Sequence, residues 1–527
     1  MSEKFPDNIA EALKLIAVLQ TEIASLQEKN KQLELVANNL SEMLTKSRKM
    51  MFGKSSEQIK NMPGSEQLSF FNEAEQEYNS AAPEPKEETL VKAHARKPKR
   101  TKEELTENLV HKEEIIDLED EKKKCNICGS DLVCIGKEKL RSELNIVPAQ
   151  IFVIDYYRYV YKCPKCEKET DEANIIKPAA PVAVMKKSMA SPATVAYTIQ
   201  EKYQNGVPLF RQEQYWKSNG VELNRNTLAN WIIRSAQWFN PLWNLMKSEL
   251  FKEDIVHADE TELRVLKCDG QPTNSTSRMW VFCSGMYSSK PMALYQYHPT
   301  RSSIVVKDVI GDYAGFLQTD GYQAYNSAEN AIHIGCWAHA RRKFIDCLPK
   351  GIDDKNSKAA QALDLIERLF SMEKAFKGMP ENEIYEQRKK KSQPLLEEYW
   401  KLLNHILAPG GSKLDGAVKY SINHKTELEG FLLDGRIELT NNRAERAVKP
   451  FVIARKNFLF SDTSKGAEAS ALCFSMIETA KLNNLNVYGY LIYLFNELPK
   501  LGEKPDEDKL KNLLPWLKTL PEYCKKA

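Results

Sequence analysis

A change in the period of hydrophobic residues near residue 254 constrains the fold of this chain more than any other feature. From there the sequence follows a period of two, and "IVHADETELRVL" (255–266) predicts a β-strand. The segments that follow predict a pair of hairpin strands, a helix, a fourth strand, and a short strand that runs into a basic helix, at 277–288, 290–299, 302–312, 313–326 and 332–348. This order predicts a sheet with helices packed around it, and therefore an α/β core.

Two aspartates occupy positions that a strand usually fills with Val or Ile. Asp259 follows "IVHA" inside the first predicted strand, and Asp320 ends the strand "GFLQT". An acid inside an apolar strand must be paired, lie in a solvated cleft or bind a metal ion. The structural alternatives are a strand-edge acid for Asp259 and an ordinary Asp-Gly turn for Asp320.

A third acid, Glu445, lies in the polar segment "LTNNRAERAVKP" (439–450). One acid in the first strand, one after the fourth and one on a later helix would surround a single cleft of an RNase H-like sheet. A charged helical stretch at about 355–435 fills the long gap before Glu445 as an insertion. Three carboxylates suit Mg²⁺ or Mn²⁺. Two such ions, about 3.5–4 Å apart, cut or join phosphodiesters.

Spacing alone leaves the role of Glu445 open. Asn442 and Glu445 also form a pattern like a capping box, in which Glu reaches back to the start of its helix. Glu438, before the helix, and Glu478, on an amphipathic helix, compete for the place of the third acid.

Basic and amide side chains accompany these acids and predict contacts with DNA phosphates. The predicted DNA-binding residues are His339, Arg341, Arg342, Lys343, Asn441, Asn442, Arg443, Arg446, Lys449, Arg455 and Lys456. For the basic helix, plain surface charge is the alternative. His333, Cys336 and His339 recur every three residues, which makes zinc conceivable there, but no fourth ligand is evident.

Two CxxC pairs predict a zinc site. Cys125 and Cys128 form the first pair, and Cys163 and Cys166 the second. Four thiolates complete the tetrahedral shell of one Zn²⁺ and leave no open position, which predicts a structural role. The strand-like stretch between the pairs (144–162) predicts a hairpin that closes the long gap.

The N-terminal region predicts a coiled coil. Residues 9–44 carry Ile, Asn, Ala or Leu at position a of successive heptads and Ala or Leu at position d, with Asn30 at a central a position. This pattern favours a parallel dimer whose register the Asn fixes. A helix packed within its own domain is the alternative.

Residues 190–250 predict helices separated by turns at Asn205-Gly206 and Asn219-Gly220. A DNA-binding helix-turn-helix and a plain helical core unit both fit this pattern. The fold class predicted for the whole chain is multidomain α+β. The predicted divisions are a coiled coil, a linker, a zinc-finger-like domain, a helical DNA-binding region, the RNase H-like core and a C-terminal helical segment, at 1–58, 59–110, 111–180, 181–250, 251–465 and 466–527.

Composition limits the binding surfaces and cellular compartments that we expect for the protein. The formal net charge of the 527 residues is only +3, so a polyanion site must be a local patch. No apolar run is long enough to span a membrane, the N-terminus lacks a signal-peptide pattern, and 11 cysteines do not suggest a secreted disulfide framework. We therefore expect a reducing cytoplasm.

Several segments in order resemble one family. "VHADET", "LQTDGYQAYN", "GCWAHARRKF" and "LTNNRAERAVKPFVIARKNFLF" are similar to the catalytic blocks of the DDE transposases of bacterial insertion sequence family sixty-six. The upstream "FGKSSEQ", the cysteine pairs and the closing "IETAKLNNLNVYGYLIYLFNELP" also resemble it. The resemblance implies Asp259, Asp320 and Glu445 as the DDE residues. The family often has Asp before the paired asparagines, where this chain has Thr440.

The resemblance implies a transposase that binds the ends of its element, dimerises or assembles further through the coiled coil, and transfers strands with two Mg²⁺ ions. Accessory proteins encoded by the same element are expected partners. A zinc-dependent DNA-binding regulator with structural acids, and an RNase H-like nuclease without strand transfer, are the alternative functions.

Overall fold

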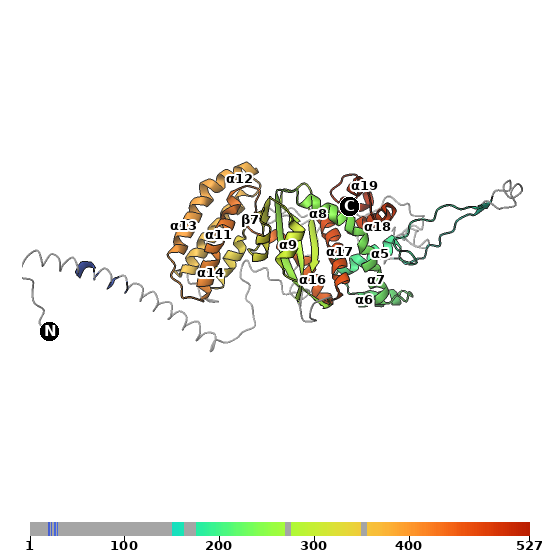
Figure 1. Ribbon diagram of the computed structural model, residues 1–527, viewed down its shortest axis with the longest axis horizontal. Helices are drawn as coiled ribbons and strands as arrows, with labels where there is room; N and C mark the ends of the chain where they lie inside the picture. The colour runs from blue at the N-terminus through green and yellow to red at the C-terminus, as the bar shows by residue number, and fades with distance from the viewer. Residues whose placement is uncertain are drawn as a thin grey trace, which may run out of the picture. The chain divides into compact units, whose positions relative to one another are not determined.

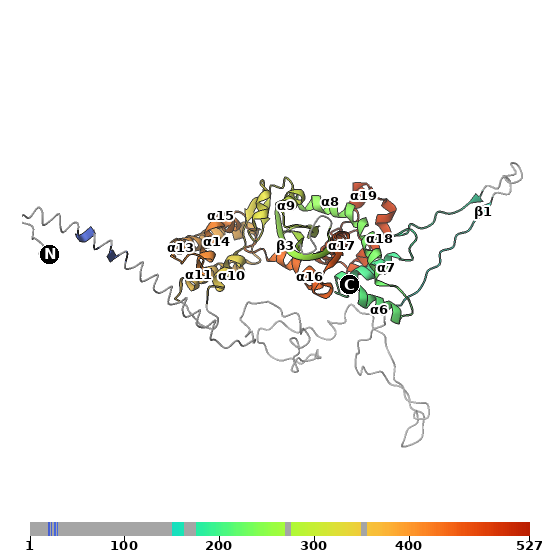
Figure 2. The ribbon, with the colours of Figure 1, turned by 60° about the horizontal axis from the view of Figure 1, so that its bottom comes forward.

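The computed structural model describes residues 150–162, 175–268, 276–348 and 356–526, with a few helical residues between 19 and 29 (Figures 1 and 2). The described residues from 157 to 526 belong to the larger of the two units into which the chain divides. The predicted linker and the four predicted zinc ligands, Cys125, Cys128, Cys163 and Cys166, lie outside the described residues.

A mixed sheet forms the centre of the larger unit. Its strands run in the order β5-β4-β3-β6-β7, and β8 also pairs with β3. Strands β3, β4 and β5 are antiparallel neighbours, whereas β6, β7 and β8 join in parallel. The strand bounds are Ile255–Lys267 (β3), Thr276–Ser284 (β4), Ala293–His298 (β5), Phe316–Gln318 (β6), Ile332–Ile334 (β7) and Ser461–Thr463 (β8). The predicted mixed α+β class is confirmed.

Helix α16 (Asn442–Phe458) packs against strands β3 and β4. Its buried residues Ala444, Val448, Phe451 and Ala454 recur at helical spacing and form one apolar stripe. This stripe sets the rotation of the helix against the sheet, and with it the direction of the polar residues beside the stripe.

Helices that precede the sheet in the chain and helices that follow it share one hydrophobic core with the sheet. Helix α17 packs on β5, and α18 packs on α5. The sequence places a boundary at 250 and another at 465, yet residues on both sides of each belong to this core. These helices are α5 (Pro192–Tyr203), α6 (Leu209–Ser218), α7 (Arg225–Ala236), η2 (Gln237–Phe239), α8 (Asn240–Leu250), α9 (Ser303–Ile310), α17 (Ser464–Leu482), α18 (Val487–Leu501), α19 (Glu507–Lys511) and η6 (Glu522–Cys524).

A second core lies under the predicted insertion. It joins the insertion helices to Trp337 and Phe344 of the basic helix and to Ile334 of β7. The elements of this region are α10 (Trp337–Ile345), α11 (Lys358–Phe376), α12 (Glu381–Gln387), a π-helical turn η4 (Arg388–Ser392), α13 (Gln393–Asn404), α14 (Lys413–Asn423), α15 (Lys425–Glu429) and η5 (Gly430–Leu432). The short helix η3 (Gln323–Ser327) belongs to the first core through Ala324 and Tyr325.

Of the strand expected at 144–162, the structure describes residues 150–162. Only β1 (Tyr161–Lys162) is paired, antiparallel to β2 (Ile175–Ile176), and described residues 150–160 form no ladder. Within the described residues, no helix is both long and apolar enough to cross a membrane.

Candidate active site

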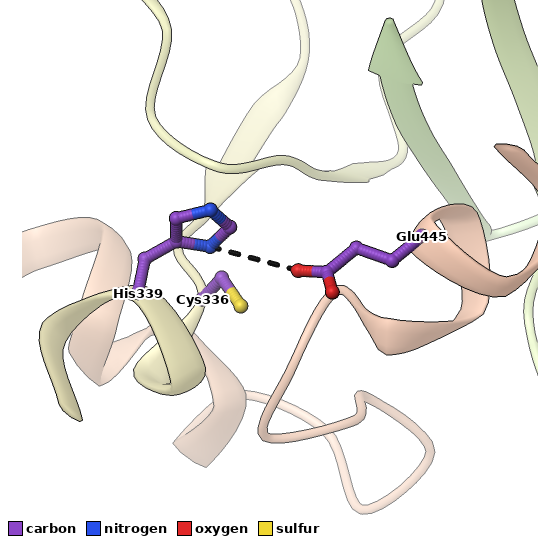
Figure 3. A group of neighbouring side chains, drawn as sticks. All are labelled: Cys336, His339 and Glu445. Atoms are coloured by element: carbon purple, nitrogen blue, oxygen red, sulfur yellow. Dashed lines mark ion pairs between the residues drawn. The ribbon is translucent and has the colours of Figure 1, made fainter. Parts of the chain in front are cut away.

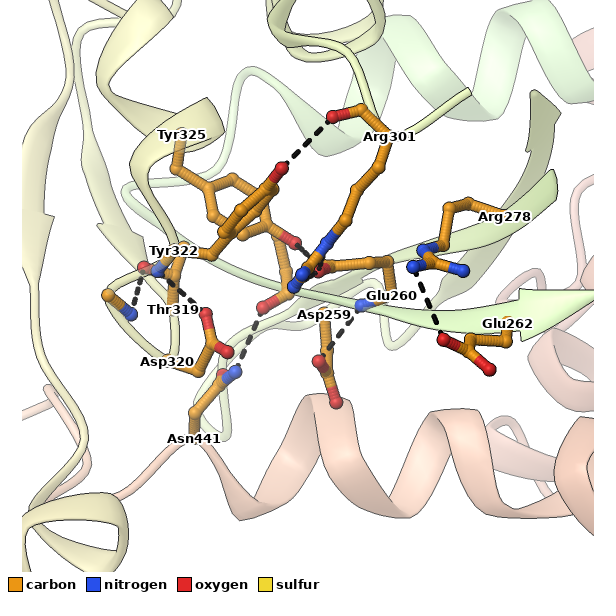
Figure 4. Close-up of polar contacts among 12 residues, drawn as sticks. Asp259, Glu260, Glu262, Arg278, Arg301, Thr319, Asp320, Tyr322, Tyr325 and Asn441 are labelled. Atoms are coloured by element: carbon orange, nitrogen blue, oxygen red, sulfur yellow. Dashed lines mark hydrogen bonds and ion pairs between the residues drawn. The ribbon is translucent and has the colours of Figure 1, made fainter. Parts of the chain in front are cut away.

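Strand β3 carries the first of the three acids. His257 and Asp259 are two residues apart and project from the same face, and Asp259 points toward helix α16 (Figure 4). Oδ1 of Asp259 accepts a 2.9 Å hydrogen bond from the backbone N–H of Glu260. Burial, together with the charges of Glu260, Asp320 and Glu445, raises the pKa of Asp259 to about 8. The three predicted acids are therefore close enough to repel one another.

Asp320 lies in a turn directly after β6. Its Oδ1 accepts the backbone N–H of Tyr322 at 2.9 Å, and Thr319 Oγ1 accepts that of Gly321 at 3.2 Å (Figure 4). Gly321 has φ +87°, a conformation that other residues rarely adopt, so the Asp-Gly pair is required for this turn. Tyr420 of the insertion donates a 3.0 Å hydrogen bond to the Asp320 carbonyl oxygen. The insertion thus fixes the turn that carries the second acid.

Glu445 lies in the first turn of α16. The capping-box alternative is wrong in this structure, because the helix begins at Asn442 and the N-cap residue Asn441 makes no side-chain capping bond. Oε1 of Glu445 is buried and has no hydrogen-bond partner. The carboxylate is therefore not used to close the helix end.

Asn441 ties the start of α16 to strand β3. Its side chain is fully buried. Its Nδ2 donates a 2.8 Å hydrogen bond to the Ala258 carbonyl, and its Oδ1 lies 3.1 Å from Nδ1 of His257. The backbone N–H of Asn441 donates to Sγ of Cys336 at 3.2 Å. The predicted DNA contact of Asn441 is contradicted, since its amide is bonded inside the protein.

The competing acid Glu438 is also occupied. Its carboxylate accepts a 2.9 Å hydrogen bond from Arg443 and lies 3.3 Å from Nε2 of the buried His257. Burial alone would raise the pKa of Glu438, but the hydrogen bond and charge of His257, together with Arg443, hold it at about 2. The other competitor, Glu478, pairs with Lys481 on α17 at 2.7 Å. Neither acid is among the largest influences on the pKa of Asp259.

His339 lies beside Glu445 and not on an open surface. Its Nδ1 is 3.8 Å from Glu445 Oε1 (Figure 3). Burial lowers the pKa of His339, against the charges of Glu445 and Asp320, which raise it. His333 is not part of this group, since its Nε2 bonds the carbonyl of Ala328 at 3.2 Å.

Some of the other predicted DNA-binding residues are paired or half-buried, and the rest are exposed. Arg341 is held by Glu367 at 2.6 Å, as Arg443 is by Glu438. Burial lowers the pKa of Arg455, which is half-buried, as is Asn442. The exposed cations are Arg342, Lys343, Arg446, Lys449 and Lys456.

Two polar clusters around the acids have no counterpart in the sequence-based predictions. On the far face of β3, Glu260 binds Arg301 and accepts a 2.7 Å hydrogen bond from Tyr325 (Figure 4). On the near face, His257 connects Glu438 with Asn441. The position of His257 two residues before Asp259 is a usable signal, because period two places both side chains on one face.

The three acids fit a divalent metal. They offer hard oxygen donors, which Mg²⁺ prefers. Because the pKa of Asp259 is raised to about 8, a cation bound nearby would favour the ionised form of this carboxyl group. The oxygen donors and the crowding of negative charge therefore both favour a divalent cation at this site.

Comparisons with known proteins identify the family. The model of the "Transposase IS66 family" matches residues 187–469, and those of its zinc-finger binding domain and C-terminal element match 122–167 and 475–516. A model described as "Transposase C of IS166 homeodomain" matches 39–113.

Two proteins of Sinorhizobium fredii (strain NBRC 101917 / NGR234), both described as uncharacterized, are also similar. Protein y4qI is 28% identical over 519 residues, which cover 95% of this chain and 93% of y4qI. Protein y4jD is 29% identical over 418 residues, which cover 76% of this chain and 79% of y4jD. Because the first family model spans more than half of the chain, this protein belongs to the IS66 family of transposases.

Proposed function

We propose that this transposase has an RNase H-like DDE core in which Asp259, Asp320 and Glu445 bind the catalytic metal ions. The strand order supports this proposal. Asp259 lies in the first strand of the sheet, Asp320 follows the fourth, and Glu445 lies on a helix packed against the first. This is the arrangement that the sequence predicts for such a core.

The observation that carries the proposal is the electrostatic coupling of the three acids. Asp320 and Glu445 both raise the pKa of Asp259, although they lie far from it and from each other in the chain. Among the described residues, no basic side chain forms an ion pair with Asp259, and the charges that act most strongly on its pKa are those of three acids. A site that gathers negative charge without pairing it favours an external cation.

Mg²⁺, when bound by these carboxylates, would activate the attacking oxygen and stabilise the leaving oxygen of a phosphodiester. The acids themselves do not become nucleophiles. The exposed cations of α10 and α16 would hold DNA phosphates beside them.

The reaction has two phosphoryl transfers. Water attacks the phosphorus at each element end, the P–O3′ bond breaks, and a 3′-hydroxyl remains on the element. That hydroxyl then attacks a target phosphorus in line, forms a new P–O bond and displaces the target 3′-oxygen. In both steps the leaving oxygen takes up a proton, and no oxidant or reductant is needed.

The remaining predictions complete the proposal. Four cysteines, Cys125, Cys128, Cys163 and Cys166, would hold one structural Zn²⁺. Residues 9–44 would form a dimer seam, and Leu19, Ile23 and Leu26, which this pattern places at d and a, are helical and exposed. The transposase would then bring two element ends together in the cytoplasm, at the nucleoid, with accessory proteins of the same element as further partners.

Strand transfer on DNA tests the function. The substrate is a duplex carrying the terminal inverted repeats that flank the coding region, incubated with Mg²⁺ and target DNA. We expect Asp259→Asn and Glu445→Gln to lose cleavage and joining by about 10³-fold or more, because each removes a ligand charge. Glu478→Gln is the matched control, since it removes an acid held by Lys481. Undiminished joining by Asp259→Asn would remove the assignment.

The two alternative functions give different products. A DNA-binding regulator would bind the ends with or without Mg²⁺ and never nick them. An RNase H-like nuclease would release fragments without joining any 3′ end to target DNA. Product analysis of the same reactions therefore separates all three.

A further inference from the structure

Three possible metal ligands of different chemistry converge next to the proposed catalytic acids. Cys336 occupies the N-cap position of α10, His339 lies in the first turn of that helix, and Glu445 lies in the first turn of α16. Their ligand atoms all lie within 4.8 Å of one another, and Figure 3 shows the side chains turned toward a common point. The sequence suggested His333 for such a group, but the fold supplies Glu445 instead.

His339 and Glu445 each hold a buried side-chain atom that has no hydrogen-bond partner among the described residues. His339 Nδ1 and Glu445 Oε1 are both buried and unbonded, and they lie 3.8 Å apart, too far for a hydrogen bond. An unsatisfied buried polar atom costs about 1–3 kcal/mol. Native structures rarely keep two such atoms facing each other without a function.

The third atom is held in place from the other side. Sγ of the fully buried Cys336 accepts the backbone N–H of Asn441, the residue that anchors α16 to β3. The sulfur and the carboxylate are therefore fixed to each other through the start of α16.

The donor set selects a different class of metal from the three acids. A thiolate with an imidazole and a carboxylate suits Zn²⁺ and similar borderline ions, whereas Mg²⁺ takes oxygen donors. Three protein ligands leave the fourth tetrahedral position to water. Binding would release the thiol proton to solvent.

We propose that Cys336, His339 and Glu445 form a second metal site, selective for Zn²⁺ or a similar thiophilic divalent ion, which withdraws Glu445 from Asp259 and Asp320 when occupied. Glu445 is the shared ligand, so occupation of this site opposes the catalytic arrangement. Zn²⁺ at this site is then an inhibitor of strand transfer. The inhibition rests on the proposed function, but the binding does not.

Metal binding is measured on the full chain without DNA. The metal-free protein is titrated with Co²⁺, whose thiolate complexes absorb in the near ultraviolet, and Zn²⁺ content is measured after removal of excess metal. We expect about two ions per wild-type chain, one in the predicted zinc finger and one here, and about one in Cys336→Ala. Glu445→Gln should retain the thiolate band but bind about tenfold or more weakly.

Cys268→Ser is the matched control, because Cys268 is half-buried at the end of β3 and lies outside the group. If Cys336→Ala fails to fold, Cys336→Ser keeps an acceptor for the Asn441 N–H and serves in its place. Equal stoichiometry and equal cobalt spectra in the wild type and a folded Cys336 variant would overturn the site.

Inhibition is measured by strand transfer at saturating Mg²⁺ with increasing Zn²⁺, and each variant is compared with its own rate without added Zn²⁺. We expect the half-inhibitory Zn²⁺ concentration to rise about tenfold or more in Cys336→Ser and to stay unchanged in Cys268→Ser. Binding without a Cys336-dependent change in inhibition would overturn the inhibitory role. An enzyme without any strand transfer would contradict the proposed function and leave the binding measurement intact.

Discussion

The side-chain amide of Asn441 donates a 2.8 Å hydrogen bond to the carbonyl of Ala258, the residue directly before Asp259. The parallel ladder between β3 and β6 ends at His257 and Gln318, and the amide bonds the next carbonyl along β3. Gln318 in turn donates to the Glu438 carbonyl at 2.6 Å. The segment that leads into α16 is thus bonded to the strands that carry the first two acids.

This relationship predicts a structural effect for Asn441→Ala. The change leaves the Ala258 carbonyl and His257 without their partner, so we expect a loss of about 1–3 kcal/mol in the free energy of unfolding. Strand transfer should fall as well, because Glu445 follows one turn later. Urea unfolding measures the first effect, and the joining of end-sequence DNA to target DNA measures the second.

Asn442→Ala is the control for that experiment, since Asn442 is adjacent and half-buried. It should unfold in urea close to the wild type. A stable Asn441→Ala protein that has lost only DNA affinity would show that the amide contacts DNA after all.

The ion pair of Glu438 predicts a particular acid sensitivity. Its pKa is about 2 in the folded protein, against an ordinary value of 4.5. The ionised form therefore stabilises the fold by about 3 kcal/mol. This contribution is fully present above pH 4.5 and is lost as the pH falls toward 2. Urea unfolding of the wild type and Glu438→Gln at several pH values between 7 and 3 measures it, and the difference between them should shrink as the pH falls. A difference that does not change with pH would contradict the ion pair.

Asp259→Asn predicts opposite effects with and without metal. In chelator at a pH above 8, the change removes a charge that burial, Glu260 and Asp320 oppose, so the variant should melt at or above the wild-type temperature. Added Mg²⁺ should raise the melting temperature of the wild type and leave that of Asp259→Asn almost unchanged. Equal shifts in both proteins would place the metal elsewhere.

Arg388 predicts how the insertion is held. Its guanidinium is buried, pairs with both carboxylate oxygens of Glu373 at 2.9 and 2.7 Å, and donates to the carbonyls of Phe431, Asp434 and Ile437. Arg388→Ala leaves the carboxylate and three carbonyls without these donors, so we expect a loss of about 3–5 kcal/mol. Hydrogen exchange should locate the effect in the insertion helices.

Lys390→Ala, an exposed change in the same π-helical turn, is the control and should exchange like the wild type. Unchanged protection of the insertion in Arg388→Ala would show that its apolar core alone is sufficient.

The sequence alone predicted the order of strands and helices in the core, the helical insertion and the family. The spacing of hydrophobic residues, every second residue in a strand and every three to four in a helix, is a property of neighbouring residues. The elements predicted from this spacing form in the structure as β3, β4, β5 and α10. The acids were visible for the same reason, since Asp259 interrupts an apolar strand and Asp320 follows one.

The tertiary structure decided which polar residues bind each other. Glu438 and Glu445 are equally acidic in the sequence, but only the first meets His257 and Arg443, so only the second is left beside Asp259. Asn441 resembles a surface residue in the sequence, yet the stripe of α16 that packs on the sheet buries it against β3. The proximity of Cys336 and Glu445 also depends on how α16 packs against the sheet. Burial and pairing depend on side chains more than 100 residues apart, and local sequence patterns carry no information about those contacts.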